Sequence, residues 1–324
     1  MTQVQGSVWV EIITLKASES ADAVGTALEY TEGRLYEQKC YGTFADDMPE
    51  SDFRFRIAFV QHEGDFKMHA HEYSELVFVM GGRGVHRTEI EEYDLETGDV
   101  FVISGDRKHG FSDAEKLSLC NIMFDSSQFL EGRSELEEMM GYHALFDLQP
   151  RTRSVDRFRE RLHLSAENLA YASDIITTLN TEYGKQAEGR RLVITSAFHL
   201  LVAFLCRLYS REKRETALPL TQMAGVASHI QKNYHETIRI EDLARIANLS
   251  VSQLQRKFKK IYNETPVQYI NKLRIHEACE MLKNTNLSIT QIAYDCGFGS
   301  SSFFATQFRQ ARGESPSDYR RKFA

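Results

Sequence analysis

Two different periods of apolar residues divide the chain. Between residues 50 and 125, apolar and polar residues alternate in short runs, as in β-strands that have one buried face. Glycine and aspartate turns separate these runs, and we expect Gly81-Gly82 to end one of the strands. Short strands in this arrangement predict an antiparallel β-barrel or sandwich, and we assign residues 1–150 to it.

Beyond residue 150 the period of apolar residues becomes helical. One apolar stripe covers residues 169–179 and a second covers residues 192–205, which predicts two antiparallel helices. We assign residues 151–219 to this helical hairpin and a following linker. Two apolar stripes allow the hairpin to cap the β domain, to form a homodimer, or to do both.

The strongest pattern is an internal repeat within residues 220–324. Leu243 corresponds to Ile292, an offset of 49 residues, and Leu254 corresponds to Phe304, an offset of 50. Each copy predicts two helices that meet at a sharp turn, and a longer helix from about residue 267 to residue 283 joins the copies. The fold class is therefore a multidomain α+β protein with an N-terminal β-barrel, a helical hairpin and a C-terminal all-α domain of two helix-turn-helix units.

Special residues stand at matched positions of the two copies. Asn248 and Gly297 lie where each turn needs a residue that tolerates a positive φ. Ser250 and Ser300 are placed to cap the second helix of each unit. These matches predict two helix-turn-helix units of the same design.

The second helix of each unit has a face that its own core does not use. Apolar residues four positions apart face the core, and the opposite face is free to enter a major groove of DNA. In the first copy, glutamine and arginine suit base edges and lysines suit phosphates. The second copy presents smaller side chains, so we expect it mainly to position the domain on the DNA through shape and backbone contacts. The candidate DNA-contacting residues are Ser250, Ser252, Gln253, Gln255, Arg256, Lys259, Lys260, Ser301, Ser302, Thr306 and Arg309.

The charge of the chain supports contact with nucleic acid at one end only. The whole chain has a net charge of −7, but residues 220–324 hold 15 Lys and Arg against 9 Asp and Glu. The remainder holds 24 against 37, so a basic segment of +6 follows an acidic one of −13. This asymmetry is typical of a protein in which one domain meets phosphate.

Composition predicts a cytoplasmic protein. No apolar run in the sequence approaches the roughly 20 residues that a membrane helix needs, and the N-terminal residues lack the pattern of a signal peptide. The five cysteines have no metal-type spacing and are expected to be reduced thiols: Cys40, Cys120, Cys206, Cys279 and Cys296.

Over about residues 225–322 the chain resembles the AraC/XylS family of bacterial regulators. The resemblance rests on Arg274-Ile275, Ala278, the run from Ile289 to Phe298, Phe303-Phe304, Phe308-Arg309 and Gly313-Glu314-Ser315-Pro316. It implies two helix-turn-helix subdomains joined by a long helix, entering successive major-groove segments of promoter DNA. It also implies that the base-reading residues are Ser250, Ser252, Gln253, Gln255 and Arg256, with Ser301, Ser302 and Thr306 in the second unit.

The N-terminal half resembles the cupin-type sensor of such regulators. His69, His71 and Glu75 are separated by even steps, so on one extended strand they share a face, and His109 follows Gly98-Asp99. Cupin motifs hold a metal through three histidines and one glutamate, and such a set suits Zn, Mn, Fe or Ni. His86 is a further polar candidate for an effector pocket formed with these four residues.

Three interpretations of the histidine and glutamate cluster stay open. The residues can bind a divalent transition metal, line a metal-free pocket for a small polar effector such as a sugar, or be structural remnants of the fold. The function predicted for the chain is a dimeric, sequence-specific regulator, most simply an activator, that binds promoter DNA and RNA polymerase and is not an enzyme. The alternatives are a metal-dependent cupin enzyme fused to a DNA-binding domain, and a constitutive DNA-binding protein whose barrel only dimerises.

Overall fold

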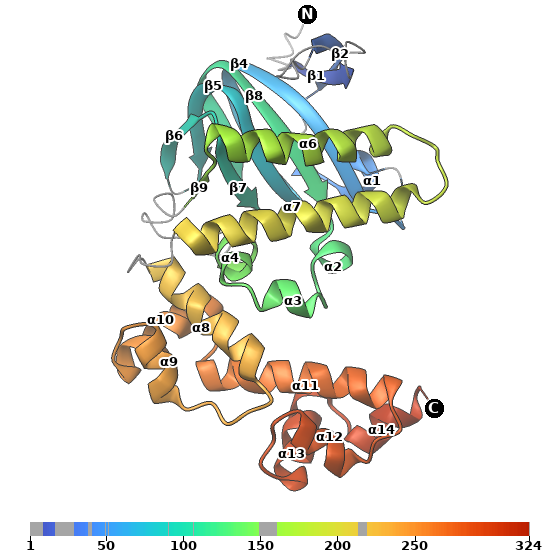
Figure 1. Cartoon of the computed structure of the whole chain (residues 1–324), viewed down its shortest axis with the longest axis vertical. Helices are drawn as coiled ribbons and strands as arrows, with labels where there is room; N and C mark the ends of the chain where they lie inside the picture. The colour runs from blue at the N-terminus through green and yellow to red at the C-terminus, as the bar shows by residue number, and fades with distance from the viewer. Residues whose placement is uncertain are drawn as a thin grey trace, which may run out of the picture. The chain divides into compact units, whose positions relative to one another are not determined.

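The computed structural model of the chain describes residues 9–16, 29–37, 41–48, 50, 52–89, 91–105, 107–148, 161–212 and 219–323. The chain forms two compact units, one made of residues 1–133 and 145–211 and the other of residues 134–144 and 212–324. All described strands belong to the first unit, and the second is helical (Figure 1). The expected boundary at Pro150 and the position of Cys40 lie outside the described residues.

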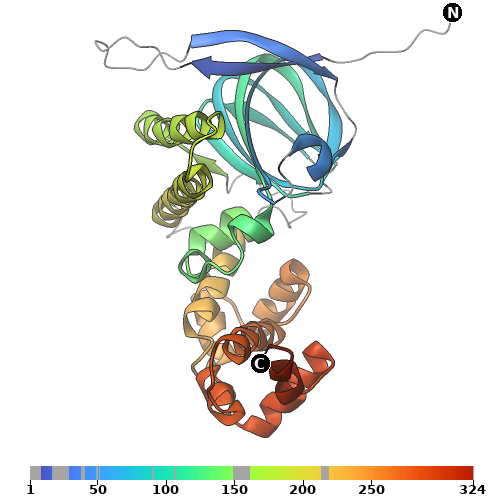
Figure 2. The same ribbon diagram turned by 90° about the vertical axis from the view of Figure 1, so that its right-hand side faces the viewer.

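The first unit is built on a curved sheet (Figure 2). Its hydrogen-bonded order is β2-β1-β4-β8-β5-β7-β9, while β6 pairs with β5 and the short β3 pairs with β4. Every described pair is antiparallel except β3 with β4, which confirms the predicted antiparallel β domain, although hydrogen bonds do not close the described sheet into a barrel. The strands are β1 (Trp9–Lys16), β2 (Glu29–Glu37), β3 (Tyr41–Gly42), β4 (Phe55–His71), β5 (Ser74–Thr88), β6 (Glu92–Glu96), β7 (Asp99–Ile103), β8 (His109–Phe124) and β9 (Leu162–His163).

The main strands are longer than the alternating runs predicted. The expectation that Gly81-Gly82 ends a strand is wrong, because β5 continues through both glycines to Thr88. Gly82 has a φ of +74°, and the register of β5 against β8 shifts around it, as in a β-bulge. A Cβ atom at Gly82 would lie 2.1 Å from the carbonyl oxygen of Lys116, so only glycine lets the two strands approach here.

Two helices cover one face of this sheet, as the helical periodicity predicted. They are α6 (Ala166–Tyr183) and α7 (Arg190–Glu212), which run side by side in Figures 1 and 2. The ring of Phe198 on α7 lies 5.7 Å from that of Phe55 and 4.8 Å from that of Phe124. Leu192 was expected in the buried stripe of α7, but its side chain is 72% exposed because the stripe begins at Ile194.

By length and composition, the stretch Arg190–Arg211 of α7 is apolar enough to cross a membrane, which the sequence analysis did not anticipate. The same test is passed by core helices of globular proteins, and 44% of the apolar window is buried in this structure. The aromatic contacts of Phe198 account for that buried side.

Each unit also contains short helices. They are α1 (Phe44–Asp47) and α2 (Ser126–Phe129) in the first unit, and α3 (Ser134–Glu137) and α4 (Met140–Tyr142) in the second, followed by the π-helix η1 (His143–Leu148). In the second unit, α3 and α4 pack on α8 (Pro219–Asn233), where Gln231 donates a hydrogen bond to Glu137 at 3.0 Å.

The rest of the second unit holds the predicted pair of helix-turn-helix units. The first is α9 (Ile240–Ile246) and α10 (Val251–Tyr262), and the second is α12 (Ile289–Asp295) and α13 (Ser301–Arg312). Between them runs α11 (Pro266–Asn284), and α14 (Pro316–Arg321) follows. The two units and the long helix between them confirm the C-terminal architecture expected from the repeat.

Candidate functional site

The two helix-turn-helix units repeat the same backbone hydrogen bonds. In the first turn the amide of Leu249 donates to the carbonyl of Ala244, and in the second the amide of Phe298 donates to the carbonyl of Ala293, both at 2.9 Å. Both alanines are buried where the helices of each pair meet. Gly299 is the extra residue of the second turn, which explains why the repeat offset changes from 49 to 50 residues.

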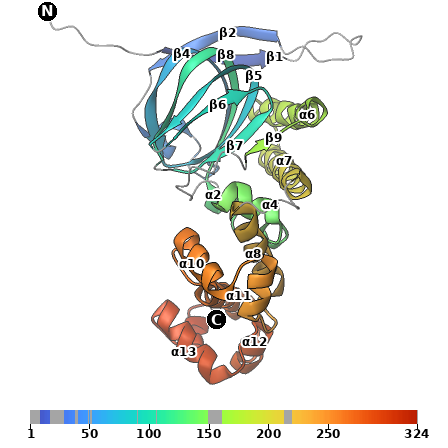
Figure 3. The same ribbon diagram turned by 90° about the vertical axis from the view of Figure 1, so that its left-hand side faces the viewer.

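The second helix of each unit buries one face and exposes the other. Leu254 and Phe258 of α10 are fully buried, as are Phe304 and Phe308 of α13. The two helices lie on one side of the second unit, with α11 between them (Figure 3). The residues of the opposite face of α10 are exposed, namely Ser252, Gln253, Gln255, Arg256, Lys259 and Lys260. A helix with this exposed face fits a major groove.

Two of the predicted DNA-contacting residues also hold the start of α10. The hydroxyl of Ser250 accepts from the amide of Gln253 at 3.3 Å, and the side-chain carbonyl of Gln253 accepts from the amide of Ser250 at 3.0 Å. This capping box satisfies amides that the helix leaves free. Both side chains therefore position the helix, and the hydroxyl of Ser252 lies within hydrogen-bonding distance of that of Ser250, at 3.2 Å. Gln255 and Arg256 lie outside this capping network and are the freer candidates for base contact.

The second unit presents a less polar face. Ser302, Thr306 and Arg309 are exposed on α13, and Ser301 is half-buried. The hydroxyl of Thr306 donates to the carbonyl of Ser302 at 3.0 Å, so it already has one partner within the helix. Phe303, which the sequence analysis did not include among the candidates, is 49% exposed between them.

The sensor unit brings together the predicted histidines and glutamate. His71, Glu75 and His109 are buried, and their ligand atoms lie within 4.8 Å of one another. The Oε2 atom of Glu75 is 3.5 Å from Nε2 of His71 and 3.7 Å from Nε2 of His109. His69 is half-buried at the edge of this cluster, with its ring centroid 4.2 Å from that of His109.

The even spacing predicted that His69, His71 and Glu75 lie on one strand, but the structure divides them between two strands. His69 and His71 end β4, but a turn at residues 72–73 follows, and Glu75 belongs to β5. His109 begins β8 and pairs with His69 in the sheet register. The convergence therefore comes from three strands, which the curvature of the sheet brings together.

Backbone carbonyls fix the orientation of the three histidine rings. The Nδ1 atom of His71 lies 2.7 Å from the carbonyl oxygen of Tyr73, that of His109 lies 3.2 Å from the carbonyl oxygen of Arg107, and that of His69 lies 3.3 Å from the carbonyl oxygen of Lys67. A neutral histidine that donates from Nδ1 carries its lone pair on Nε2. The rings are thus set to offer Nε2 as an acceptor.

Burial and mutual interaction shift the pKa values of this cluster. Burial and the neighbouring histidines hold the pKa of His109 well below its ordinary value, and burial lowers the pKa of His69. Burial also opposes the charged forms of His71 and Glu75, but their mutual attraction outweighs it, so the pKa of His71 is raised and that of Glu75 is lowered. Glu75 therefore stays a carboxylate at neutral pH.

The chemistry of this donor set fits a divalent transition metal. The Nε2 atom of His71 is buried and makes no hydrogen bond of good geometry, and Asn121 also leaves its Oδ1 atom without a partner. Lone pairs of imidazole and carboxylate groups with ring nitrogens held by carbonyls are the arrangement typical of metal ligands. His71, Glu75 and His109 would hold the ion, with His69 beside them.

His86 lies beside this cluster but faces another partner. Its ring stacks between those of Phe101 and Phe111, at centroid distances of 4.8 and 5.2 Å, and its Nδ1 atom is hydrogen-bonded to the hydroxyl of Tyr93. The centroid of His109 is 5.8 Å from that of His86. His86 therefore forms part of the wall of the cluster. No sequence pattern pointed to Tyr93 as its partner.

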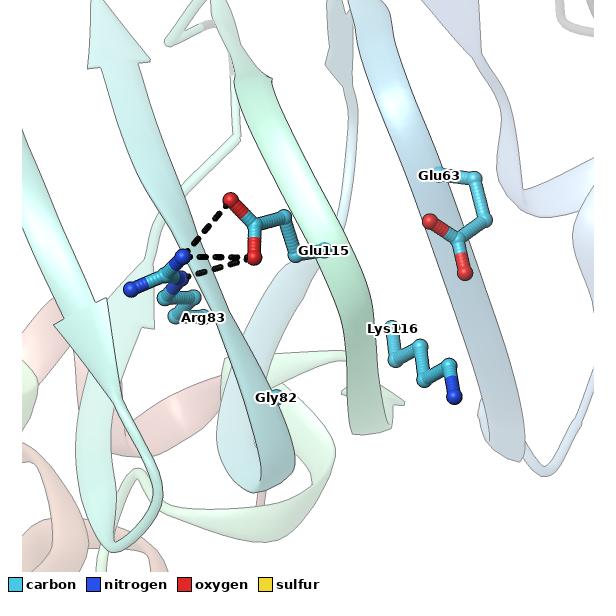
Figure 4. A pocket seen from close by; sticks show the side chains of 5 residues that line it. All are labelled: Glu63, Gly82, Arg83, Glu115 and Lys116. Atoms are coloured by element: carbon cyan, nitrogen blue, oxygen red, sulfur yellow. Dashed lines mark hydrogen bonds and ion pairs between the residues drawn. The ribbon is translucent and has the colours of Figure 1, made fainter.

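A separate hollow lies on the outer surface of the sheet (Figure 4). Arg83 and Glu115 make a two-pronged ion pair across neighbouring strands, with both hydrogen bonds at 2.9 Å, and Glu63 and Lys116 line the other side. Gly82 completes the lining, and all five residues are exposed. The hollow contains none of the predicted effector residues.

Comparisons with known proteins agree with both halves of the structure. Residues 243–322 match the helix-turn-helix domain family and residues 56–122 match the cupin domain family. The chain is 25% identical over 262 residues to the HTH-type transcriptional activator RhaR of Mannheimia succiniciproducens, which covers 81% of this chain and 90% of that protein. It is 28% identical over 257 residues to the HTH-type transcriptional activator RhaS of Pectobacterium atrosepticum, covering 79% and 88%.

The match to the helix-turn-helix family falls on the duplicated units, and the RhaR relative aligns with 81% of this chain. The chain is a DNA-binding transcription regulator that carries an AraC-type helix-turn-helix domain and a cupin domain. A crystal structure of an AraC-type transcriptional regulator from Chromobacterium violaceum is 30% identical over 32% of this chain and 92% of that one, with a TM-score of 0.30. Within this AraC-type chain, the histidine cluster lies inside the segment that matches the cupin domain.

Proposed function

We propose that this AraC-family protein is a dimeric, cytoplasmic transcription activator that reads promoter DNA mainly through α10 and responds to a small polar effector in its sensor unit. The observation that carries the proposal is the exposed polar face of α10 opposite the buried Leu254 and Phe258. Relatives of nearly equal length are named transcriptional activators, which supports the same role here and a contact with RNA polymerase.

On α10, Arg256 is the central candidate for base recognition. It is exposed, no described side chain holds it in an ion pair, and it stands one turn beyond Ser252 on the same face. An arginine in this position can donate two hydrogen bonds to a guanine edge. Lys259 and Lys260 follow in the last turn, where their ammonium groups suit phosphates on either side of the groove.

A dimer is supported by an exposed apolar stripe on α7. Leu192 is 72% exposed and Leu200 is 50% exposed, and further along α7 the ring of Phe204 lies 4.7 Å from that of Tyr171 on α6, which is 46% exposed. Large exposed apolar residues that gather on one helix face are typical of protein contacts. A second copy of the chain is the partner we propose for this face.

In the sensor unit, we propose that the cluster of His71, Glu75 and His109 holds a metal ion or, directly, the polar groups of the effector. Both interpretations use the same acceptor atoms. A sugar or related metabolite supplies hydroxyl donors, and a metal supplies a positive centre that can bind oxygen atoms of the effector. We propose that this site serves recognition rather than catalysis, because the relatives that align with about four fifths of this chain, 81% and 79%, are named as transcriptional activators.

The proposal is tested by replacing Arg256 in the full chain. Duplexes selected from a random library by the wild-type protein are the probe, and binding is measured at two or more salt concentrations. Arg256→Ala should weaken binding to the selected duplex by roughly 10- to 100-fold and much less to unrelated DNA. Arg133→Ala, which removes an exposed arginine of the other unit, is the matched control and should bind as wild type. Unchanged specific binding by Arg256→Ala would refute the assignment of α10.

A further inference from the structure

Phe303 is an apolar side chain on the exposed face of the second candidate reading helix. It is 49% exposed, and it stands next to Ser302 and one turn before Thr306, both of which are exposed. The fully buried Phe304 and Phe308 lie on the other side of α13. Phe303 is thus not a core residue of its unit.

The internal repeat shows which residue of the first unit is equivalent to Phe303. With the offset of 50 residues that holds beyond the turn, Phe303 corresponds to Gln253, so both are the third residue of the second helix. In the first unit, Gln253 closes the capping box. In the second unit, Ser300 caps α13 alone by accepting from the amide of Phe303 at 3.2 Å, and the phenyl ring has no role in the cap.

One side of the Phe303 ring is supported by the protein. Its centroid lies 6.2 Å from that of Phe298, which is only 2% exposed and carries the guanidinium of Arg274 at 5.7 Å from its ring. Arg274 in turn donates hydrogen bonds to the carbonyls of Tyr234 and Glu236, at 2.7 and 2.8 Å. The ring is therefore backed by fixed groups and presents its other side outward.

We propose that Phe303 contacts thymine C5-methyl groups in the major groove and so gives the second unit a preference for T·A pairs at its contact positions. This inference rests on the proposed function, because it places α13 against DNA. In the major groove the thymine methyl is the apolar feature of a base edge, and apolar side chains recognise it. Near its start α13 offers two serines, this phenylalanine and a threonine, and of these side chains Phe303 is the one suited to the thymine methyl.

The test replaces thymine by uracil, which removes the methyl group and keeps the hydrogen-bonding edge. The wild-type full chain selects duplexes from a random library, and each thymine of the selected duplex is then replaced singly by uracil. Wild type should lose about two- to fourfold in affinity at one or more positions, the magnitude of one buried methyl group. Phe303→Ala should bind thymine and uracil duplexes equally, and Phe303→Leu should keep part of the difference.

Controls separate the possible failures. Tyr294→Ala removes a comparably exposed aromatic side chain, 53% exposed on α12, and should retain the uracil effect of wild type. The inference is overturned if wild type shows no uracil effect, or if Phe303→Ala retains it in full. If Phe303→Ala does not fold, Phe303→Leu decides by the size of its uracil effect. Failure to enrich any sequence in the selection would instead count against the proposed function itself.

Discussion

Asn248 and Gly297 occupy the same place in the two helix-turn-helix units, and both have a positive φ, 51° and 83°. Their amides donate to equivalent carbonyls, those of Arg245 and Tyr294. Left-handed backbone here lets the second helix leave the first at a sharp angle, but the two residues tolerate it for different reasons. Glycine has no Cβ atom, and asparagine is among the few side chains that adopt this conformation readily.

Substitution at the two turns should therefore have unequal effects. A Cβ atom at Gly297 would lie 2.6 Å from the carbonyl oxygen of Tyr234, so Gly297→Ala adds a clash to the unfavourable φ. We expect it to lower the free energy of unfolding of the second unit by about 1–3 kcal/mol. Asn248→Gly should change it by less than about 0.5 kcal/mol. Urea unfolding followed by circular dichroism measures both, and equal effects would contradict the clash expected at Gly297.

Removal of ligands from the histidine cluster should abolish metal binding if an ion is held there. Wild type loaded with Zn, Mn, Fe or Ni should retain about one ion per chain after desalting, and His71→Ala and His109→Ala should retain little. His163→Ala is the control, because His163 belongs to a second group with Glu96 and Asp99 at the surface end of β7. Elemental analysis gives the stoichiometry. Equal metal content in all variants would show that the cluster does not hold the ion.

Charge placed on the exposed stripe of α7 should break the proposed dimer. Leu200→Glu introduces a carboxylate on the face that carries Leu192, and burying it between two copies would be costly. Light scattering after size exclusion should give the mass of one chain, 37.2 kDa, for Leu200→Glu and twice that for wild type. Thr177→Glu, an exposed change on α6, should remain dimeric. A wild-type monomer would remove this part of the proposal.

Local sequence patterns were sufficient for the helix-turn-helix units. The turn at Asn248, the cap at Ser250 and the helix start at Pro266 each depend on a few neighbouring residues, so the printed sequence contains the information directly. Because the unit is repeated, each prediction could also be checked at the equivalent position of the other copy. The predicted helix of residues 267–283 accordingly differs from α11 by one residue at each end.

Features that depend on contacts between residues far apart in the sequence were harder to predict. The convergence of Glu75 with His71 follows from a turn and a sheet curvature that the even spacing did not reveal, so the residues lie together for a reason other than the shared strand that was predicted. The exposure of Leu192 depends on where the buried stripe of α7 begins, which is at Ile194. Phe303 was overlooked because an aromatic residue beside Phe304 reads as core until the packing shows which of the two faces inward.

The central claim is that α10 and α13 both enter the major groove of one DNA site. Hydroxyl-radical and base-methylation footprinting of the full chain on a selected duplex tests it most directly. Two protected major-groove segments on one side of the DNA, centred about 10 base pairs apart, are predicted for each bound chain. Arg256→Ala should lose protection in one segment and Phe303→Ala should weaken the other. A single protected segment for each chain, unaffected by either substitution, would contradict the account.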